Sequence, residues 1–273
     1  MKVSHPLRRF TLVACAVFGL AQAQGAEPPR KPRVFFLIGE SEHHTAVSLP
    51  AFTKAELEPL GIQSTFSIQT DESSEVLPNL DSLAGADLLF ISARRKHPSA
   101  GQMELIRTFI AAGKPVAGIR TAIQAFGKRK GETDGAWDTF DKEILGATYG
   151  GHYDVGGASL VKPLPDALRH PILTGIDATE FRYSSPLYKN ALLAPTVTPL
   201  LQGRLESDPT QEPVAWINTL GKQRVFYTSL GSAEDFKVQQ FRRLLLNGIT
   251  WALGLTVPPD QAPPAPATTV LQP

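Results

Sequence analysis

The chain has 273 residues, and its 27 basic residues almost balance its 26 acidic residues, which leaves a formal net charge of +1. A near-neutral chain without a long basic run offers no electrostatic surface for nucleic acid or anionic lipid, so we expect neither as a partner. The only cysteine is Cys15. The rest of the chain therefore cannot form a disulfide, a thiolate metal site or a cysteine nucleophile.

The first 23 residues have the three-part order of a secretory signal peptide. Lys2 and the pair Arg8-Arg9 supply positive charge, Phe10 to Leu20 is apolar, and Ala21-Gln22-Ala23 offers small residues for cleavage. The apolar run is too short to cross a bilayer core of about 30 Å as a stable helix. We therefore predict an exported protein, periplasmic or extracellular, with no membrane span. Cleavage here leaves 24 basic and 26 acidic residues, a formal charge of −2.

Two other export signals overlap with this region. Leu12-Val13-Ala14-Cys15 is similar to a lipobox, which would make Cys15 a lipid anchor, and Arg8-Arg9 is a pair found in twin-arginine signals. However, few apolar residues precede Cys15 and the apolar run continues past it. Plain export is therefore the favoured interpretation.

Both ends of the remaining chain have compositions typical of flexible segments. Residues 24–32 form a short leader, and residues 255–273 are rich in proline and small side chains. Such segments cannot bury enough apolar surface to offset the entropy of ordering, so we predict a disordered tail. The intervening residues, 33–254, have the length of one α/β domain with a substantial core.

Strand and helix signals alternate through the first half of this domain. Short apolar runs predict strands at 34–38, 64–68, 87–91 and 114–119. Between them, helical spacing predicts helices at 50–60 and 99–112, each followed by a glycine, and a further helix beginning at Thr121. This order predicts a parallel sheet that is covered by helices.

The second half is harder to assign from its pattern. Residues 128–220 mix strand and helix signals with many glycines and prolines. Two strands are predicted at 214–217 and 224–230, on either side of Gly221, and a final amphipathic helix at 241–253. No internal repeat is present.

Polar residues follow the predicted strands at the points where the strands end. In an open parallel sheet, ligands bind outside the carboxyl ends of the strands. That rule nominates four stretches, Glu40–His44, Arg94–Lys96, Arg120–Gln124 and Ser229–Asp235. A solvated charge run is the alternative explanation for Arg94–Lys96.

Several long segments resemble the exported ThuA-like (trehalose utilisation) proteins. They include FFLIGESEHHTAVSLPAF (35–52), LLFISARRKHPSAGQMELIRTFIAAGKPVAGIRTAIQAF (88–126), FDKEILGATYGGHY (140–153) and PVAWINTLGKQRVFYTSLGSAEDFKVQQFRRLLLNGITWAL (213–253). The resemblance covers nearly all of 33–254. It implies a class I glutamine-amidotransferase-like fold, a flavodoxin-like three-layer α/β sandwich with a mostly parallel sheet.

In that fold a turn between a strand and a helix presents the nucleophilic cysteine, and here Arg120 has the cysteine position within Gly118-Ile119-Arg120-Thr121-Ala122. An arginine stays protonated and cannot act as a nucleophile. Glutamine amidotransferase chemistry is therefore excluded. Arg120 is instead suited to bind a carboxylate, a phosphate or a polarised sugar oxygen.

Two histidines expected from the resemblance are absent. The helix after the turn usually begins Ser-His-Ala-Phe, whereas this chain has Ile123-Gln124-Ala125-Phe126, and the Gly-His expected after the last strand is Gly231-Ser232. His152 is retained, next to Tyr153. Histidine suits acid–base work because its neutral form is a base near pH 7. The substitutions at 124 and 232 therefore favour either altered chemistry or its loss.

These arguments define the predicted site residues. His152 and Glu40 are predicted to be catalytic, exchanging a proton with the ligand. Ligand contacts are predicted for a larger polar set, namely Arg120, Arg94, Thr121, His43, Gln124, Tyr153 and Ser232. No metal and no cofactor are predicted, because adjacent residues such as His43 and His44 point opposite ways on an extended chain.

The resemblance implies a small-molecule carbohydrate as the partner. Our leading hypothesis is an exported protein that acts on (3-keto) sugars or glycosides by acid–base chemistry without a nucleophile. The alternative is a non-catalytic sugar-binding or accessory protein that has lost the family's histidines. The sequence does not set the oligomeric state.

Overall fold

The fold was analysed in a computed structural model, which describes residues 30–71, 73–153, 159–192, 194–206 and 210–259. The chain divides into the units Met1–Arg30 and Lys31–Pro273, and all described residues except Arg30 belong to the second. The predicted signal peptide with Cys15, most of the leader and residues 260–273 of the tail lie outside the described residues. Within these ranges, no helix combines the length and apolar character that a membrane span requires.

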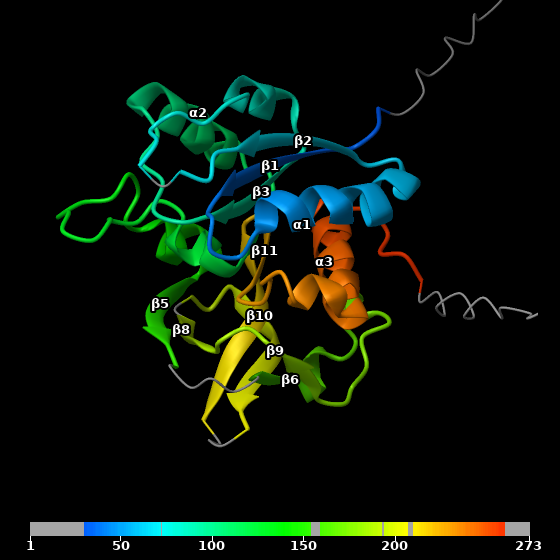
Figure 1. The fold of residues 1–273 in the computed structure, drawn as a ribbon. Helices are drawn as coiled ribbons and strands as arrows, with labels where there is room; N and C mark the ends of the chain where they lie inside the picture. The colour runs from blue at the N-terminus through cyan, green and yellow to red at the C-terminus, as the bar shows by residue number, and fades with distance from the viewer. Residues whose placement is uncertain (1–29, 72, 154–158, 193, 207–209, 260–273) are drawn as a thin grey trace, which may run out of the picture. The chain divides into compact units, whose positions relative to one another are not determined.

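A nine-stranded sheet forms the centre of the domain, in the order β2-β1-β3-β4-β11-β10-β9-β6-β7 (Figure 1). Its strands are β1 (Arg33–Gly39), β2 (Gln63–Ile68), β3 (Leu88–Ala93), β4 (Val116–Ile119), β6 (Ser159–Pro163), β7 (Phe181–Tyr183), β9 (Val197–Leu205), β10 (Gln211–Leu220) and β11 (Gln223–Thr228). A separate two-stranded sheet pairs β5 (Ala147–His152) with β8 (Tyr188–Leu192).

The sheet has a parallel half and an antiparallel half. Strands β2, β1, β3, β4 and β11 are parallel neighbours, and their order is that of flavodoxin-like sheets. From β11 outward, β10, β9, β6 and β7 pair antiparallel. The predicted three-layer α/β fold with a parallel core is confirmed. In the antiparallel extension, β10 contains the strand predicted at 214–217, whereas β9, β6 and β7 were not assigned from the sequence.

Helices cover both faces of the parallel half (Figure 1). Val34, Phe36 and Ile38 of β1 pack in one core with α1 (Thr45–Phe52) and α3 (Gln239–Ala252), whereas Phe35 and Leu37 pack in another with α2 (Ala100–Ala111). Because side chains alternate between the faces of a strand, a strand covered on both sides must be apolar at every position. This burial explains why β1 reads as a continuous apolar run.

The first helix departs from its prediction. It was predicted to begin at Pro50 but begins at Thr45, with Pro50 inside it. The Glu40 carboxylate accepts the backbone N–H of Thr45 (3.0 Å), so a residue five positions upstream satisfies a free donor of the first turn. After Pro50, which has no N–H to continue the ladder, the helix passes into a π-helical turn at Thr53–Leu57 and a 3₁₀ turn at Glu58–Leu60.

The other predicted helices are present with one exception. The predictions for α2 and α3 are confirmed, and Gly113 adopts the positive φ of 74° expected after a helix. Ser99 occupies the N-cap position of α2, but its side chain makes no capping hydrogen bond. The helix predicted from Thr121 is only a 3₁₀ turn, Arg120–Gln124. The helical segment after β4 is therefore only five residues long, and a loop follows it.

Close packing of α3 on β11 yields a stability prediction. A Cβ atom on Gly248 would lie 2.3 Å from the buried ring of Phe226, so Gly248→Ala should lower the free energy of unfolding by about 1–3 kcal/mol. Gly101 is a matched control in α2, because a Cβ there meets nothing within 4 Å. Gly101→Ala should raise stability by up to about 1 kcal/mol. Urea unfolding of both variants tests this, and equal effects would contradict the packing.

Candidate functional site

The turn after β4 is the centre of the site. Arg120 has a φ of 50°, a left-handed conformation that costs a non-glycine residue about 1–2 kcal/mol. A Cβ atom on Gly118 would lie 2.8 Å from the Cβ of Ala122, so small residues two positions before and after Arg120 are needed for this tight turn. The same spacing of small residues defines the nucleophile elbow of other α/β enzymes. Here the elbow presents an arginine.

The guanidinium of Arg120 is buried and held by carbonyl groups. Its side chain is 2% exposed, and Nη1 donates to the carbonyl oxygens of Pro186 (3.0 Å) and Ser229 (2.7 Å). The guanidinium carbon lies 4.2 Å from the centre of the Tyr188 ring, a cation–π contact. In the part of the chain that the structure describes, Arg120 makes no ion pair, so its positive charge is not neutralised by a carboxylate.

His43 is a buried imidazole near this charge. It is 8% exposed. Burial lowers the pKa of His43 below its ordinary value of 6.5, and the charge of Arg120 lowers it further, while Glu42 and Glu40 act in the opposite direction. The Nε2 atom lies 3.9 Å from a Glu42 oxygen, which is too far for a hydrogen bond. His43 is therefore a neutral imidazole at pH 7, able to take up a proton.

Two tyrosines complete the group of residues around the elbow. The rings of Tyr149 and Tyr188 meet edge to face at 4.8 Å. Burial raises the pKa of Tyr188 to about 12 against the lowering effect of Arg120, and burial also raises the pKa of Tyr149. Arg94 pairs with Glu42 at 3.5 Å. We call this group the strand-end cluster, and it consists of Glu42, His43, Arg94, Arg120, Tyr149 and Tyr188.

Four buried polar atoms of residues predicted as ligand contacts have no hydrogen-bond partner among the described residues, and they lie on the segments after β1, β4 and β11. They are His43 Nε2, Arg120 Nε, Thr121 Oγ1 and Ser232 Oγ. Buried polar atoms are nearly always hydrogen-bonded in folded proteins, so each unpaired one needs an explanation. All four lie where the strands of an open α/β sheet present their ligand-binding edge.

The structure gives Glu40 a well-defined position. It is fully buried, and its carboxylate accepts hydrogen bonds from the His43 N–H (2.6 Å), the Thr45 N–H (3.0 Å) and the Thr45 hydroxyl. These contacts hold the loop that carries His43 and begin α1. A proton exchange at Glu40 would compete with three donors, and its predicted catalytic role stays a prediction.

His152 and Tyr153 lie farther along the chain, at the end of β5. His152 is exposed and stands opposite Tyr188 in the β5–β8 pair. The Tyr153 hydroxyl donates to Glu212 of β10 at 2.8 Å, and the Lys189 ammonium lies over the Tyr153 ring. Tyr153 is thus turned toward β10, and the backbone register places His152 beside Tyr188 of the strand-end cluster.

A cavity of about 230 Å³ lies beside the elbow, and we call it the elbow cavity. It is lined by Arg95, Ile123, Gln124, Ala125, Phe126, Gly127, Lys128, Trp137, Asp138, Phe140, Asp141 and Tyr149. Gln124, predicted as a ligand contact, is in this lining, and its Oε1 accepts a hydrogen bond from Arg95 (3.3 Å). Tyr149 belongs to both the elbow cavity and the strand-end cluster.

Sequence reasoning missed several residues of this lining. Arg95 lies in the nominated Arg94–Lys96 stretch, and its position after a predicted strand is the signal that could have selected it. Its backbone φ is 48°. Asp141 was not selected from the sequence, and burial raises its pKa. Nothing in the sequence pointed to Trp137. Within the described ranges, no group of three or more His, Cys, Asp or Glu residues is placed to hold a metal ion.

The parallel sheet with its elbow defines an α/β protein of the class I glutamine-amidotransferase-like type, with arginine in place of the nucleophile. The family model for trehalose utilisation, ThuA, matches residues 33–252. The chain therefore belongs to the ThuA family.

Solved structures agree with this assignment at the level of the fold. A ThuA-like protein from Bacteroides uniformis has a TM-score of 0.60 and 16% identity, with 84% of this chain and 94% of that one covered. A ThuA-like protein from Parabacteroides merdae has a TM-score of 0.60 and 14% identity, with 86% and 94% covered. A search of curated proteins finds no sequence match.

The lowered pKa of His43 predicts a pH dependence of stability. Because the folded state keeps His43 neutral, the unfolded state binds more protons below pH 6.5. This contribution to stability is complete above pH 6.5 and is lost as the pH falls toward the folded pKa. His43→Gln should therefore make the unfolding free energy less dependent on pH between about 7 and 5, measured by urea unfolding. His170, whose pKa burial also lowers, is the control. In His170→Gln, the part of the pH dependence that comes from His43 should remain. If the unfolding free energy of His43→Gln depends on pH as strongly as that of the wild type, His43 is not a neutral buried imidazole.

Proposed function

We propose that this protein binds a small carbohydrate at the strand-end cluster and acts on it by proton transfer without a covalent intermediate. The observation that carries the proposal is the set of four unpaired buried polar atoms on the loops after β1, β4 and β11. A sugar has several hydroxyl groups that both donate and accept hydrogen bonds. One ligand can therefore satisfy guanidinium, imidazole and hydroxyl groups together. The trehalose utilisation family name supports this class of ligand.

The chemistry follows from the protonation states of the cluster. Arg120 is a permanent cation whose guanidinium donates, among the described residues, only to neutral carbonyl groups, so it can stabilise negative charge that develops on a ligand oxygen. His43 is neutral and can accept a proton. In a 3-keto sugar the C–H bond beside the carbonyl is the acidic one. His43 would take that proton while Arg120 stabilises the resulting enolate oxygen.

We further propose that the chain acts outside the cytoplasm. The charged, apolar and small-residue order of residues 1–23 supports this location. The same proposal assigns 33–254 as the working domain.

Replacing Arg120 tests the proposed ligand site. Arg120→Met keeps an apolar side chain of similar length and should abolish sugar binding. A ligand present at 100 times its dissociation constant adds about 2.7 kcal/mol to the stability of the wild-type chain, or several degrees in Tm. Arg224→Met is the matched control, because Arg224 also lies over an aromatic ring, that of Trp251, and donates to a backbone carbonyl. Thermal unfolding with simple and 3-keto sugars should show a shift in wild type and Arg224→Met only. A shift retained in Arg120→Met would refute the site.

A non-catalytic sugar-binding protein is the second candidate function. It is favoured by the lining of the elbow cavity, which contains Gln124 and no histidine among the described residues. An amide forms hydrogen bonds but does not exchange protons near neutral pH. A site with this lining can recognise a sugar even where it does not transform it.

Restoring the two histidines separates the two candidates. The double variant Gln124→His, Ser232→His adds imidazoles beside the elbow cavity and at the unpaired Ser232 hydroxyl. If the wild type is an enzyme that uses His43, it turns over a 3-keto sugar, and His43→Gln lowers the rate at least tenfold. If the wild type is inactive, gain of turnover by the double variant would indicate an enzyme that has lost its histidines. Continued inactivity of the double variant with unchanged affinity would support the binding protein. Product formation by chromatography distinguishes these outcomes.

A further inference from the structure

We propose that Asp235 is the positioning residue for Arg120, because one oxygen of its carboxylate connects the two chain segments whose carbonyl groups hold the guanidinium. The inference rests on the proposed function, in which Arg120 stabilises negative charge on a ligand oxygen. It adds the residue that keeps this cation in place. Asp235 acts through Ser185 and through the loop after β11, and not by contact with the ligand.

The two segments that hold the guanidinium are far apart in sequence. Arg120 Nη1 donates to the Pro186 carbonyl (3.0 Å) between β7 and β8, and to the Ser229 carbonyl (2.7 Å) directly after β11. An arginine side chain has several rotatable bonds and loses much conformational entropy when it is ordered. The guanidinium therefore keeps one position only if both carbonyl groups keep theirs. This arrangement requires a contact between the two segments.

Asp235 makes that contact through a single oxygen. Its Oδ2 atom accepts the Ser185 hydroxyl (2.5 Å) of the first segment and the backbone N–H groups of Gly231 (2.8 Å) and Ser232 (3.0 Å) of the second. Asp235 is fully buried, and its own N–H donates to the Ser232 carbonyl (3.0 Å). Hydrogen bonds to a carboxylate are shorter and roughly twice as strong as those between neutral groups. One buried side chain therefore ties the two segments together.

The backbone of Arg120 is held independently of Asp235. It lies in the turn after β4, and its carbonyl accepts the Tyr227 hydroxyl (2.6 Å). The small residues Gly118 and Ala122 allow this turn to be tight. Loss of Asp235 should therefore leave the turn in place and release the guanidinium.

The pKa of His43 depends on where the guanidinium lies. Burial lowers this pKa most, and the positive charge of Arg120 lowers it further. Glu42 and Glu40, in the loop after β1, raise it, and Arg94, after β3, lowers it. A variant that displaces the Arg120 cation should therefore raise the pKa of His43 even when no ligand is present.

The sign of the change separates positioning from a direct effect of charge. A carboxylate favours the protonated form of an imidazole, so removal of the Asp235 charge alone would lower the pKa of His43. Displacement of the Arg120 cation raises the same pKa, because a positive charge moves away. A rise in Asp235→Ala therefore indicates that the guanidinium has left its place.

The test is an NMR titration of His43 in the purified protein with isotope-labelled histidine, in which His43→Gln assigns the resonance. Arg120→Met sets the scale and should raise the pKa of His43. Asp235→Ala should produce at least half of that rise. Asp235→Asn keeps an acceptor oxygen for the same three donors, so it should produce less than a quarter of the rise.

A buried amide provides the control for general damage to the fold. Asn247 is fully buried, and its Nδ2 donates to the carbonyls of Ile172 and Thr174, both at 2.8 Å. Asn247→Ala therefore also removes a buried polar side chain that connects distant segments. It should lower stability and leave the pKa of His43 unchanged.

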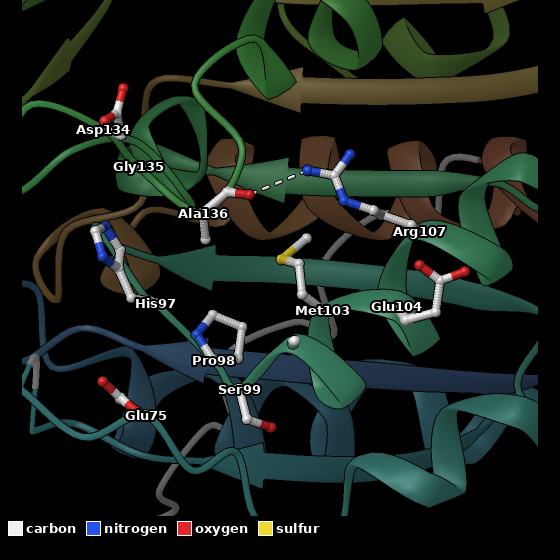
Figure 2. A pocket seen from close by; sticks show the side chains of 11 residues that line it. Glu75, His97, Pro98, Ser99, Met103, Glu104, Arg107, Asp134, Gly135 and Ala136 are labelled. Atoms are coloured by element: carbon white, nitrogen blue, oxygen red, sulfur yellow. Dashed lines mark hydrogen bonds between the residues drawn. The ribbon is translucent and has the colours of Figure 1, made fainter.

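A second arginine provides the control for loss of a cation. Arg107 lines a cavity of about 520 Å³ between the start of α2 and residues 134–136, where it donates to the Ala136 carbonyl (3.0 Å), as Figure 2 shows. Like Arg120, it lies over an aromatic ring, that of Trp137 at 4.1 Å. Arg107→Met should leave the pKa of His43 unchanged.

The outcomes separate this inference from the proposed function. If Arg120→Met raises the pKa of His43 but Asp235→Ala leaves it unchanged or lowers it, the positioning role is overturned alone. The same holds if Asp235→Asn shows the full rise, or if Asn247→Ala shows a rise as large as that of Asp235→Ala. No rise in Arg120→Met would overturn both the inference and the strand-end cluster. The expected rises in a wild type that binds no sugar would overturn only the proposed function.

A smaller change covers the case in which Asp235→Ala fails to fold by circular dichroism. Ser185→Ala removes only the contact between Asp235 and the first segment. It should raise the pKa of His43 by part of the amount seen in Arg120→Met. An unchanged pKa in Ser185→Ala would then overturn the inference.

Discussion

Arg120 connects the turn after β4 to two segments that are distant in sequence. Its guanidinium donates to the carbonyls of Pro186 and Ser229, and its backbone carbonyl accepts the Tyr227 hydroxyl at 2.6 Å. Burying a charge is costly unless it is paired and hydrogen-bonded, and here the partners are carbonyl dipoles and the face of the Tyr188 ring. The left-handed backbone at Arg120 and the burial of a charge without a carboxylate partner each carry an energetic cost. A feature that costs stability at the ligand-binding edge of a sheet points to function.

Two buried carboxylates fix the loops on either side of this arginine. Glu40 accepts the N–H groups of His43 and Thr45. Asp235 accepts the Ser185 hydroxyl (2.5 Å) and the N–H groups of Gly231 (2.8 Å) and Ser232 (3.0 Å). Each carboxylate therefore holds a loop that carries an unpaired polar atom, His43 Nε2 in one case and Ser232 Oγ in the other. Carboxylates that accept several backbone donors make rigid supports for a binding site.

The sequence predicted the features that depend on local pattern. The parallel strands are covered on both faces, so their apolar runs were visible, and the turn at Arg120 followed from its place after β4. The predicted start of α1 was wrong because the N–H of its first residue, Thr45, is satisfied by Glu40, five residues upstream, and no local pattern connects the two. The antiparallel strands β6, β7 and β9 were not assigned, because β6 and β9 contain proline or glycine and β7 has only three residues.

Part of the candidate site was also predicted, because the position of a residue after a strand can be recognised from the local sequence pattern. Arg120, His43, Thr121 and Ser232 were selected by their positions at strand ends, and the structure places an unpaired buried polar atom on each. Glu40 was also selected, but a sequence does not show that its oxygens accept backbone donors. Trp137 and Tyr149 line the elbow cavity with residues 95 and 124, and such neighbours are brought together only by the fold.

The charge distribution of the strand-end cluster limits the reactions it can support. Burial raises the pKa of Tyr149 and Tyr188 and lowers that of His43, so all three are neutral at pH 7. The charged members are then Arg94 and Glu42, which pair with each other, and Arg120, which pairs with no described carboxylate. Negative charge that develops on a ligand oxygen would meet an unneutralised cation, while a neutral imidazole is available to receive a proton. This combination favours stabilising an oxyanion over forming a covalent intermediate, and it requires one base rather than several histidines. The absence of histidine at 124 and 232 therefore does not by itself remove the chemistry that His43 and Arg120 support.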